Sequence, residues 1–181
     1  MTAFLRSTPG YRAVGGAALV ERQVASKSRM WRGVSTTNVS NVRYNARSSH
    51  SIFSKCQRAK VKFTGFAPTI TDEGDITNDI KVQFAIRIGA QVVQATFGGQ
   101  LQGIIPAGAA EYWSDWLYAS AFGLPYFQNT ACIFHTELQV NPGEKLPTAQ
   151  TGREANEAFT FDNGSGASQI LSTAALTGTS S

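Results

Sequence analysis

The chain has 181 residues and a net charge of +4, and 42% of its residues are hydrophobic while 15% are charged. This composition suits one globular domain and excludes a highly charged disordered chain. No run approaches the ~18 consecutive apolar residues that a membrane span needs. The apolar stretch Ala17–Val20 is too short for a signal-peptide core. We therefore expect neither membrane insertion nor classical secretion.

The charge is distributed unevenly along the chain. Residues 1–62 contain twelve Lys and Arg residues and one acid, which gives this part a net charge of +11. Residues 63–181 contain four basic and eleven acidic residues, which gives a net charge of −7. The sequence thus predicts a basic arm on an acidic body. Such an arm suits a polyanion or an acidic protein surface, because the attraction depends on charge and not on sequence.

Residues 1–38 show no sustained hydrophobic periodicity and predict an extended basic arm. One short helix is expected around Ala17–Ser26, where helix-compatible residues follow two glycines. The residues expected to anchor the arm are Arg22, Lys27, Arg29, Trp31 and Arg32. An aromatic ring between cations also suits nucleic acid. However, the basic residues are spread about one in five rather than clustered, which favours an acidic protein neighbour.

From Val39 onward the pattern changes to a period of two, as in Val82, Phe84 and Ile86, which alternate with more polar residues. This alternation is typical of antiparallel strands with one buried face. Strands are expected at 39–44, 59–66, 79–88, 91–97, 101–105, 111–119, 131–140 and 157–161. Turn signals between them predict an all-β fold, an antiparallel jelly-roll-like β-sandwich whose body spans 39–162. The small polar residues at 163–181 predict a flexible Gly/Ser/Thr tail or linker.

Catalysis by a histidine needs a positioned nucleophile beside it. His135 and Glu137 alternate with apolar residues in the expected strand at 131–140, so we expect both at the surface rather than in a pocket. His50 has no recognisable catalytic context either, and we predict no catalytic residues and no enzyme. Cys56 and Cys132 lie far apart without metal-ligand spacing, which predicts reduced, packed thiols.

The acidic loop at 72–79 offers hard oxygen ligands from Asp72, Asp75 and Asp79, the ligand type that calcium prefers. Its spacing does not fit an EF-hand, because Gly74 comes too early and no bidentate glutamate follows at the required distance. Aspartate, asparagine and glycine also build turns, so we expect a solvated turn, with a calcium site as the alternative. No metal and no cofactor are predicted.

Aromatic residues are densest around the expected strand at 111–119, where Tyr112, Trp113, Trp116 and Tyr118 form a candidate interface or glycan-stacking cluster. In one continuous strand, Trp113 and Trp116 would point to opposite faces. We therefore expect the cluster to divide between core and inter-subunit packing. Stacking on sugar rings is the alternative.

Several features follow one another in a characteristic order: Arg47-Ser48-Ser49-His50, Val61-Lys62-Phe63, the strand at 80–88, Ala95-Thr96-Phe97-Gly98-Gly99, Ile104-Ile105-Pro106-Ala107-Gly108 and Ser114-Asp115. In this order the body resembles a β-sandwich module of tailed-phage proteins and of regions that precede SGNH-type hydrolase domains. Such a hydrolase needs a Gly-Asp-Ser turn and an Asp-x-x-His motif. The nearest match is Gly74-Asp75-Ile76, without a hydroxyl, so the catalytic half is missing from these residues.

The resemblance implies a structural protein of a virus particle, as in a tailed bacteriophage, with the virion as its location. Its expected role is that of a capsid decoration or cement protein, or of a fibre-anchoring protein. The expected partners are capsid or tail subunits and further copies of the chain, with nucleic acid less favoured and no membrane. The alternative is a carbohydrate-binding accessory module that recognises a host glycan and forms the N-terminal part of a longer SGNH-type hydrolase.

Overall fold

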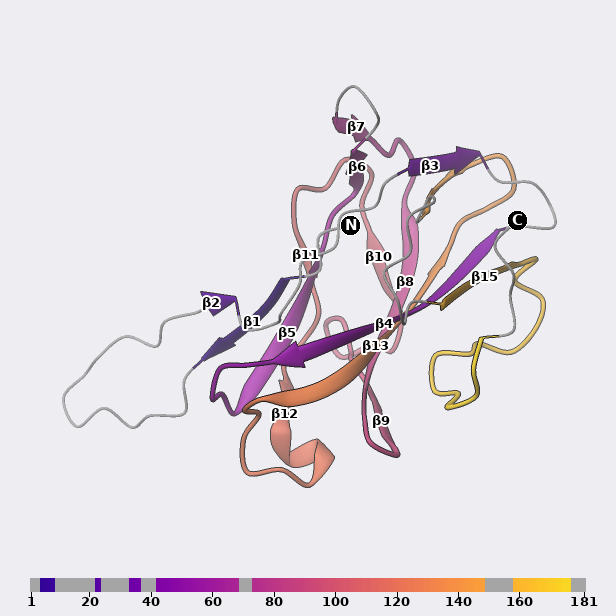
Figure 1. The fold of residues 1–181 in the computed structure, drawn as a ribbon. Helices are drawn as coiled ribbons and strands as arrows, with labels where there is room; N and C mark the ends of the chain where they lie inside the picture. Colours follow the sequence, from indigo (N-terminus) through magenta and orange to yellow (C-terminus); the bar gives the residue numbers. More distant parts are fainter. Residues whose placement is uncertain are drawn as a thin grey trace.

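The computed structural model describes residues 4–8, 22–23, 33–36, 42–68, 73–148 and 158–176. They form an all-β fold in which two antiparallel sheets pack face to face, so the predicted β-sandwich class is confirmed (Figure 1). The helical content is a single 3-10 turn, η1 at Ala119–Phe122, among these described residues.

The larger sheet is built around two long strands, β8 (Ile80–Ile88) and β13 (Thr130–Gln139). β13 also pairs with β4 (Arg43–Ile52), so it lies in the centre of the sheet. The order is β10-β8-β13-β4-β15, and β9 pairs with β8 on the same edge as β10. The bounds of the remaining strands are β9 (Gln91–Gln94), β10 (Gly103–Ile105) and β15 (Ala158–Asp162).

The smaller sheet is centred on β5 (Arg58–Phe63). One edge of β5 pairs with β11 (Tyr112–Trp113) and β12 (Leu117–Tyr118). The other edge pairs with β1 (Phe4–Thr8), which in turn pairs with β2 (Arg22–Gln23). Two short pairs complete the fold: β3 (Gly33–Thr36) with β14 (Lys145–Thr148), and β6 (Phe66–Pro68) with β7 (Glu73–Asp75).

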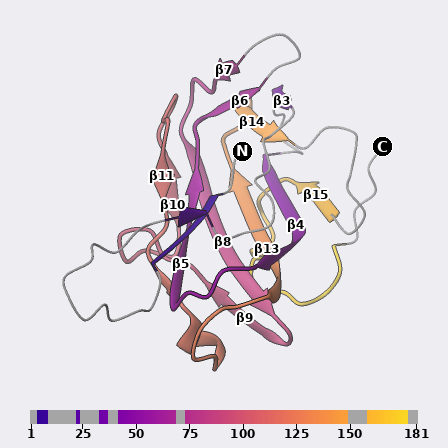
Figure 2. The same cartoon turned by 60° about the vertical axis from the view of Figure 1, so that its left-hand side comes forward.

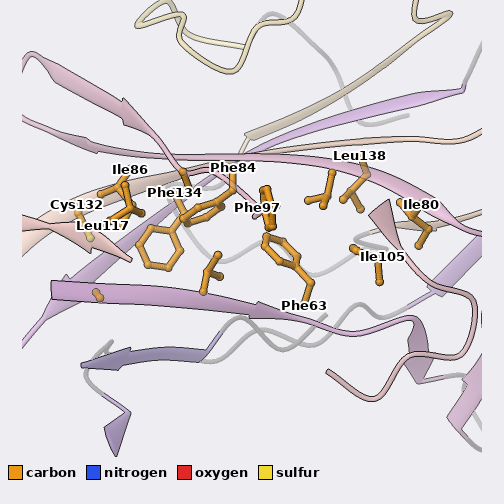
Figure 3. Close-up of a cluster of buried hydrophobic side chains, with 14 of the residues drawn as sticks. Phe63, Ile80, Phe84, Ile86, Phe97, Ile105, Leu117, Cys132, Phe134 and Leu138 are labelled. Atoms are coloured by element: carbon orange, nitrogen blue, oxygen red, sulfur yellow. The ribbon is translucent and has the colours of Figure 1, made fainter. Parts of the chain in front are cut away.

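The core lies between the two sheets and is rich in aromatic rings (Figure 3). Phe84 of β8 is fully buried and contacts two other phenylalanines edge-on, at centroid distances of 5.8 Å to Phe63 and 5.3 Å to Phe134. Edge-to-face contact is a preferred geometry because the ring edge is positive and its face is negative. Cys56 and Cys132 are buried and not joined in a disulfide.

The strand boundaries differ from the expected ones in informative places. The strand predicted at 39–44 runs instead from Arg43 to Ile52, through Ser48, Ser49 and His50, whose polar side chains hid it. The pairs β6–β7 and β3–β14 were not predicted. Within the predicted helix at 17–26, the described residues Arg22 and Gln23 form a strand, because they pair with β1.

Candidate functional site

The outer face of the smaller sheet carries a row of cations. Along β5, the residues Ala59, Val61 and Phe63 are fully buried, while the residues between them point outward. These outward residues are Arg58, Lys60 and Lys62. Because a strand advances about 3.3 Å per residue, neighbouring cations in this row are about 6.7 Å apart along the strand.

Two indole rings lie among these cations. Arg58 lies 4.4 Å from the centre of the Trp116 ring, and Lys60 lies 4.7 Å from it. The Trp113 ring is 4.8 Å from Lys60 and 5.7 Å from Lys62. These distances are typical of cation–π contacts.

Tyr118 completes this surface, because it lies opposite Arg58 in the pairing of β12 with β5 and residues directly opposite share a face. Its side chain is 49% exposed. We call this surface the basic-aromatic face; its residues are Arg58, Lys60, Lys62, Trp113, Trp116 and Tyr118.

The expectation that Trp113 and Trp116 point to opposite faces is wrong, because the strand expected at 111–119 is interrupted. The Ser114 hydroxyl accepts a hydrogen bond from the Val61 amide at 3.0 Å. Asp115 then turns toward a neighbouring loop instead of continuing the strand. Both indoles consequently contact Lys60 on the same face.

Asp115 fixes this interruption through its carboxylate. It accepts hydrogen bonds from the Thr96 hydroxyl at 2.7 Å, the Gly99 amide at 2.8 Å and the Gly98 amide at 3.1 Å. These hydrogen bonds lower the pKa of Asp115 below its ordinary value, because they stabilise the charged carboxylate. The Thr96 hydroxyl has the largest effect and the Gly99 amide the next largest. The loop at 96–99 and the segment with both tryptophans are therefore tied together.

Tyr112 does not belong to the exposed cluster. It lies opposite Phe63 in the pairing of β11 with β5 and therefore faces inward. Its ring stacks on Phe97 at 5.5 Å with an interplanar angle of 12°, and its hydroxyl accepts a hydrogen bond from the Ile104 amide at 3.1 Å. The four aromatic residues predicted as one site are thus divided: Tyr112 packs against the core, and the other three lie on the basic-aromatic face.

Glu111 marks one end of the basic-aromatic face. Its carboxylate lies 3.0 Å from the Lys62 ammonium and accepts a hydrogen bond from the Trp113 indole at 3.1 Å. The Glu111 side chain is 48% exposed. An ion pair with a partner this open to solvent contributes ~0.2–1 kcal/mol, so we assign Glu111 an orienting role rather than a large share of the stability.

Most of the predicted arm residues lie outside the described part of the chain: Lys27, Arg29, Trp31 and Arg32. Arg22 lies in β2, where its backbone pairs with Ser7. The anchoring role of these five residues remains a prediction.

The described part of the acidic loop consists of the strand β7 (Glu73–Asp75) and a bend at Asn78. Asp72 lies outside the described residues, and Asp75 belongs to β7, whose backbone pairs with β6. Asp79 caps a neighbouring turn, since its carboxylate accepts a hydrogen bond from the Ala107 amide at 3.0 Å. Within the described ranges, no three His, Cys, Asp or Glu side chains come together in a group that could hold a metal ion.

A second polar surface, missed in the sequence, covers the outer face of the larger sheet. The expectation that His135 and Glu137 are exposed is wrong: they are 1% and 3% exposed. The C-terminal segment 163–176, predicted as a flexible tail or linker, lies beside β4 and β13 and covers them (Figure 2). Composition gave no sign of this, because the segment has few large apolar residues and is held largely through polar contacts, although Ile170 and Leu176 are buried.

Charged residues fasten this C-terminal segment to the sheet. Arg43 Nε donates to the Asp162 carboxylate at 2.8 and 3.0 Å, and the Arg43 guanidinium reaches the Gly166 carbonyl at 2.9 Å. Glu137 accepts hydrogen bonds from the Ser168 hydroxyl at 2.9 Å and the Gln169 amide at 3.2 Å. Buried carboxylates and guanidinium groups need such partners, since leaving one unpaired is costly.

Burial shifts the pKa values of three titratable groups in the larger sheet. The pKa of His135 is lowered to about 4, chiefly by burial, against the opposing effect of a hydrogen bond with the Ile170 carbonyl. Burial also lowers the pKa of Arg47 to about 10 and raises that of the Cys132 thiol to about 12. At neutral pH, His135 is thus an uncharged ring and Cys132 a protonated thiol.

His50 is the other histidine of the chain, and its ring serves packing. It stacks on Phe134 at 4.0 Å with an interplanar angle of 19°, and it is 7% exposed. The Ser48 hydroxyl lies 2.9 Å from His50 Nε2 because residues two apart in β4 share a face. A serine hydroxyl beside a histidine could form a nucleophile–base pair, but the His50 ring is buried inside the sandwich, where it packs on Phe134.

Comparison of the chain with protein-family models, with curated proteins and with solved structures gives no significant match. The described residues contain no helix of the length and apolar character that crossing a membrane would require.

Proposed function

We propose that this chain is a non-enzymatic structural subunit of a virus particle, as in a tailed bacteriophage. In this role it is a capsid decoration or cement protein, or a fibre-anchoring protein. The proposal includes a jelly-roll-like connectivity of the sandwich, a location in the virion, and contacts with capsid or tail subunits and with further copies of the chain.

The observation that carries the proposal is the way in which segments near both chain ends add strands to the body. β1 pairs with β5, β3 pairs with β14, and β15 pairs with β4, all through backbone hydrogen bonds. Strand addition of this kind gives affinity through the main chain, and it is a recurrent way of joining one protein to another. Terminal arms that form strands suit subunits that lock to their neighbours during assembly.

The chemistry of the described residues supports a role without catalysis. The Cys132 thiol is kept protonated by burial, which makes it a poor nucleophile. His135 is covered by the C-terminal segment and bound to a backbone carbonyl. In an enzyme, such groups would be open to a substrate, whereas here they are bound or buried within the protein.

The alternative, a carbohydrate-binding accessory module, receives less support from the same geometry. Sugar rings stack on open aromatic faces. The rings of Trp113 and Trp116 are engaged by Arg58, Lys60 and Lys62, and Tyr112 is packed on Phe97. Tyr118 is then the candidate glycan-stacking residue with a largely exposed ring.

Peptide mass spectrometry across a density gradient of a lysate from the source tests this proposal. We expect the chain to band at a fixed ratio with a major capsid or tail protein. Recovery only in the soluble fractions would overturn the proposal. Peptides that continue past Ser181 into a Gly-Asp-Ser turn would instead favour the hydrolase alternative.

A further inference from the structure

We propose that the basic-aromatic face binds an acidic, extended segment of a neighbouring protein. This inference rests on the function proposed above, because it names the chemistry of a partner in the assembly. It concerns the folded body, whereas the sequence pointed to the arm as the basic element that anchors the chain.

Charge is the first argument. Arg58, Lys60 and Lys62 project from one strand toward the same side, and Lys62, at one end of the row, pairs with Glu111. A surface of this sign favours a partner that carries negative charge.

The cations are also held in place before any partner arrives. Arg58 and Lys60 lie over the Trp116 ring at 4.4 and 4.7 Å, and Lys60 and Lys62 lie over the Trp113 ring at 4.8 and 5.7 Å. Long side chains lose rotamer entropy when they are immobilised in an interface. Here the indole contacts have already restricted them, so less of this cost remains for binding.

Spacing identifies an extended polypeptide as the occupant. Alternate residues of β5 place the three cations about 6.7 Å apart, and alternate side chains of any extended segment have the same repeat. Carboxylates at alternate positions of such a segment therefore meet Arg58, Lys60 and Lys62 in register.

The aromatic residues favour protein over nucleic acid. Single-stranded nucleic acids bind through bases that stack on open aromatic rings. The two indoles are engaged by cations, so this stacking is restricted. At the Arg58 end, half-exposed Tyr118 adds apolar area. Tyrosine, tryptophan and arginine are the residues enriched in protein–protein interfaces.

The test uses the full chain and a fluorescent dodecapeptide of alternating glutamate and threonine, with binding measured by anisotropy at low ionic strength. A matching glutamine–threonine peptide and an oligothymidylate are the comparison probes. We expect the glutamate peptide to bind most tightly of the three. We expect the double variant K60Q/K62Q to weaken this binding about 3- to 25-fold, since each charge pair at a protein surface contributes up to about fivefold.

The matched control is the double variant K81Q/K145Q, which removes the same charge from two exposed lysines elsewhere on the body. We expect this control to bind the glutamate peptide within about twofold of the unaltered chain, because the charge it removes lies off the face. Thermal unfolding of both variants establishes that they are folded. Equal losses in the two variants would show that net charge alone drives binding and would overturn the proposal. Tighter binding of the oligothymidylate than of the glutamate peptide would overturn the proposal and identify nucleic acid as the ligand of this face.

Failure of this inference and failure of the proposed function have different signatures. If the chain bands with a particle but K60Q/K62Q binds the glutamate peptide normally, the face is not the docking surface, although the function stands. If K60Q/K62Q loses the peptide but the chain never bands with a particle, the face stands and the virion role does not.

Discussion

The Nδ1 atom of His135, in the middle of the central strand β13, lies 2.8 Å from the carbonyl oxygen of Ile170. A carbonyl can only accept, so Nδ1 is the protonated nitrogen of a neutral ring. This contact joins the larger sheet to a segment 35 residues further along the chain. The neutral ring is set between Arg47 and Arg87, whose charges both oppose its protonation.

The buried state of His135 predicts a loss of stability in mild acid. Its pKa is about 4 in the folded chain and 6.5 as the ordinary value, so the unfolded chain binds more protons between these limits. Stability therefore falls as pH falls through this window, by about 2 kcal/mol between pH 7 and pH 5 from this residue. Urea unfolding at both pH values measures it.

The variant His135→Gln keeps a donor for the Ile170 carbonyl and cannot titrate. Its stability should therefore change about 2 kcal/mol less between pH 7 and pH 5 than that of the unaltered chain. Glu137, Arg47 and Arg87 stay in place in both proteins, so they cancel in the comparison. The same pH dependence in both would show that His135 is not buried in this way.

Asp162 is predicted to hold the C-terminal segment in place. Its carboxylate pairs with Arg43, whose side chain is 5% exposed, and it also accepts a hydrogen bond from the Asn45 amide at 3.1 Å. Asp162→Ala should cost about 2–3 kcal/mol, because a largely buried guanidinium loses its charged partner. Hydrogen exchange should also quicken in residues 163–176, as mass spectrometry can measure.

Glu111→Ala serves as the control for Asp162→Ala, because it removes the half-exposed partner of the ion pair with Lys62. We expect it to change the free energy of unfolding by ~1 kcal/mol or less. If both variants lose the same free energy of unfolding, the Arg43–Asp162 pair does not stabilise the fold more than the Lys62–Glu111 pair does, which would contradict the role given to Asp162.

Asp115 is predicted to position both tryptophans. Asp115→Ala removes the acceptor of three hydrogen bonds from the loop at 96–99 and should cost about 1.5–3 kcal/mol. The pKa of Asp115 is lowered in the folded state, so its carboxylate stabilises the fold fully at a pH above the ordinary pKa of aspartate. This stabilisation is lost as pH falls through the folded pKa. The tryptophan emission maximum should shift as the segment at 113–116 loosens. Unchanged emission and stability would contradict this role.

Core and arm are predicted to respond in opposite ways to substitution. Phe84→Ala should lower the stability of the body by about 3–5 kcal/mol, because a fully buried phenylalanine is truncated. Replacing Arg29, Trp31 and Arg32 together with alanine should leave the melting temperature of the body within error and weaken assembly instead. Calorimetry combined with sedimentation of assembled particles separates the two effects. A large loss of body stability in the arm variant would count against the arm model.

The sequence predicted the parts of the fold that depend on alternation. The strand at 79–88 was found almost to the residue as Ile80–Ile88, because its large apolar residues recur at every second position. The strand at 131–140 likewise matches Thr130–Gln139. In both, one face enters the core and fixes the register.

Alternation fails where both faces of a strand are buried. β4 packs one face toward the core and the other under the C-terminal segment, so Arg43, Asn45 and Arg47 are buried although they are polar. Their partners, Asp162 and the carbonyls of Gly166 and Gln169, come more than 110 residues later. No local pattern predicts a pairing over that distance.

The candidate site was predicted in part. Composition identified the aromatic cluster, but the assignment of faces assumed one strand through 111–119. The break at Ser114 and Asp115 depends on hydrogen bonds to Val61 and to the loop at 96–99, which are tertiary contacts. The cations of β5 were counted with the basic arm, although they belong to the body.

Zero-length cross-linking of intact, gradient-purified particles with a carbodiimide tests the central claim most directly, because this reagent joins ammonium groups only to carboxylates in contact with them. The account predicts that Lys60 and Lys62 become joined to glutamate or aspartate residues of a neighbouring virion protein, and that Lys81 and Lys145 do not. Cross-links from this face that reach only Glu111 of the same chain, in particles that do contain the protein, would contradict it.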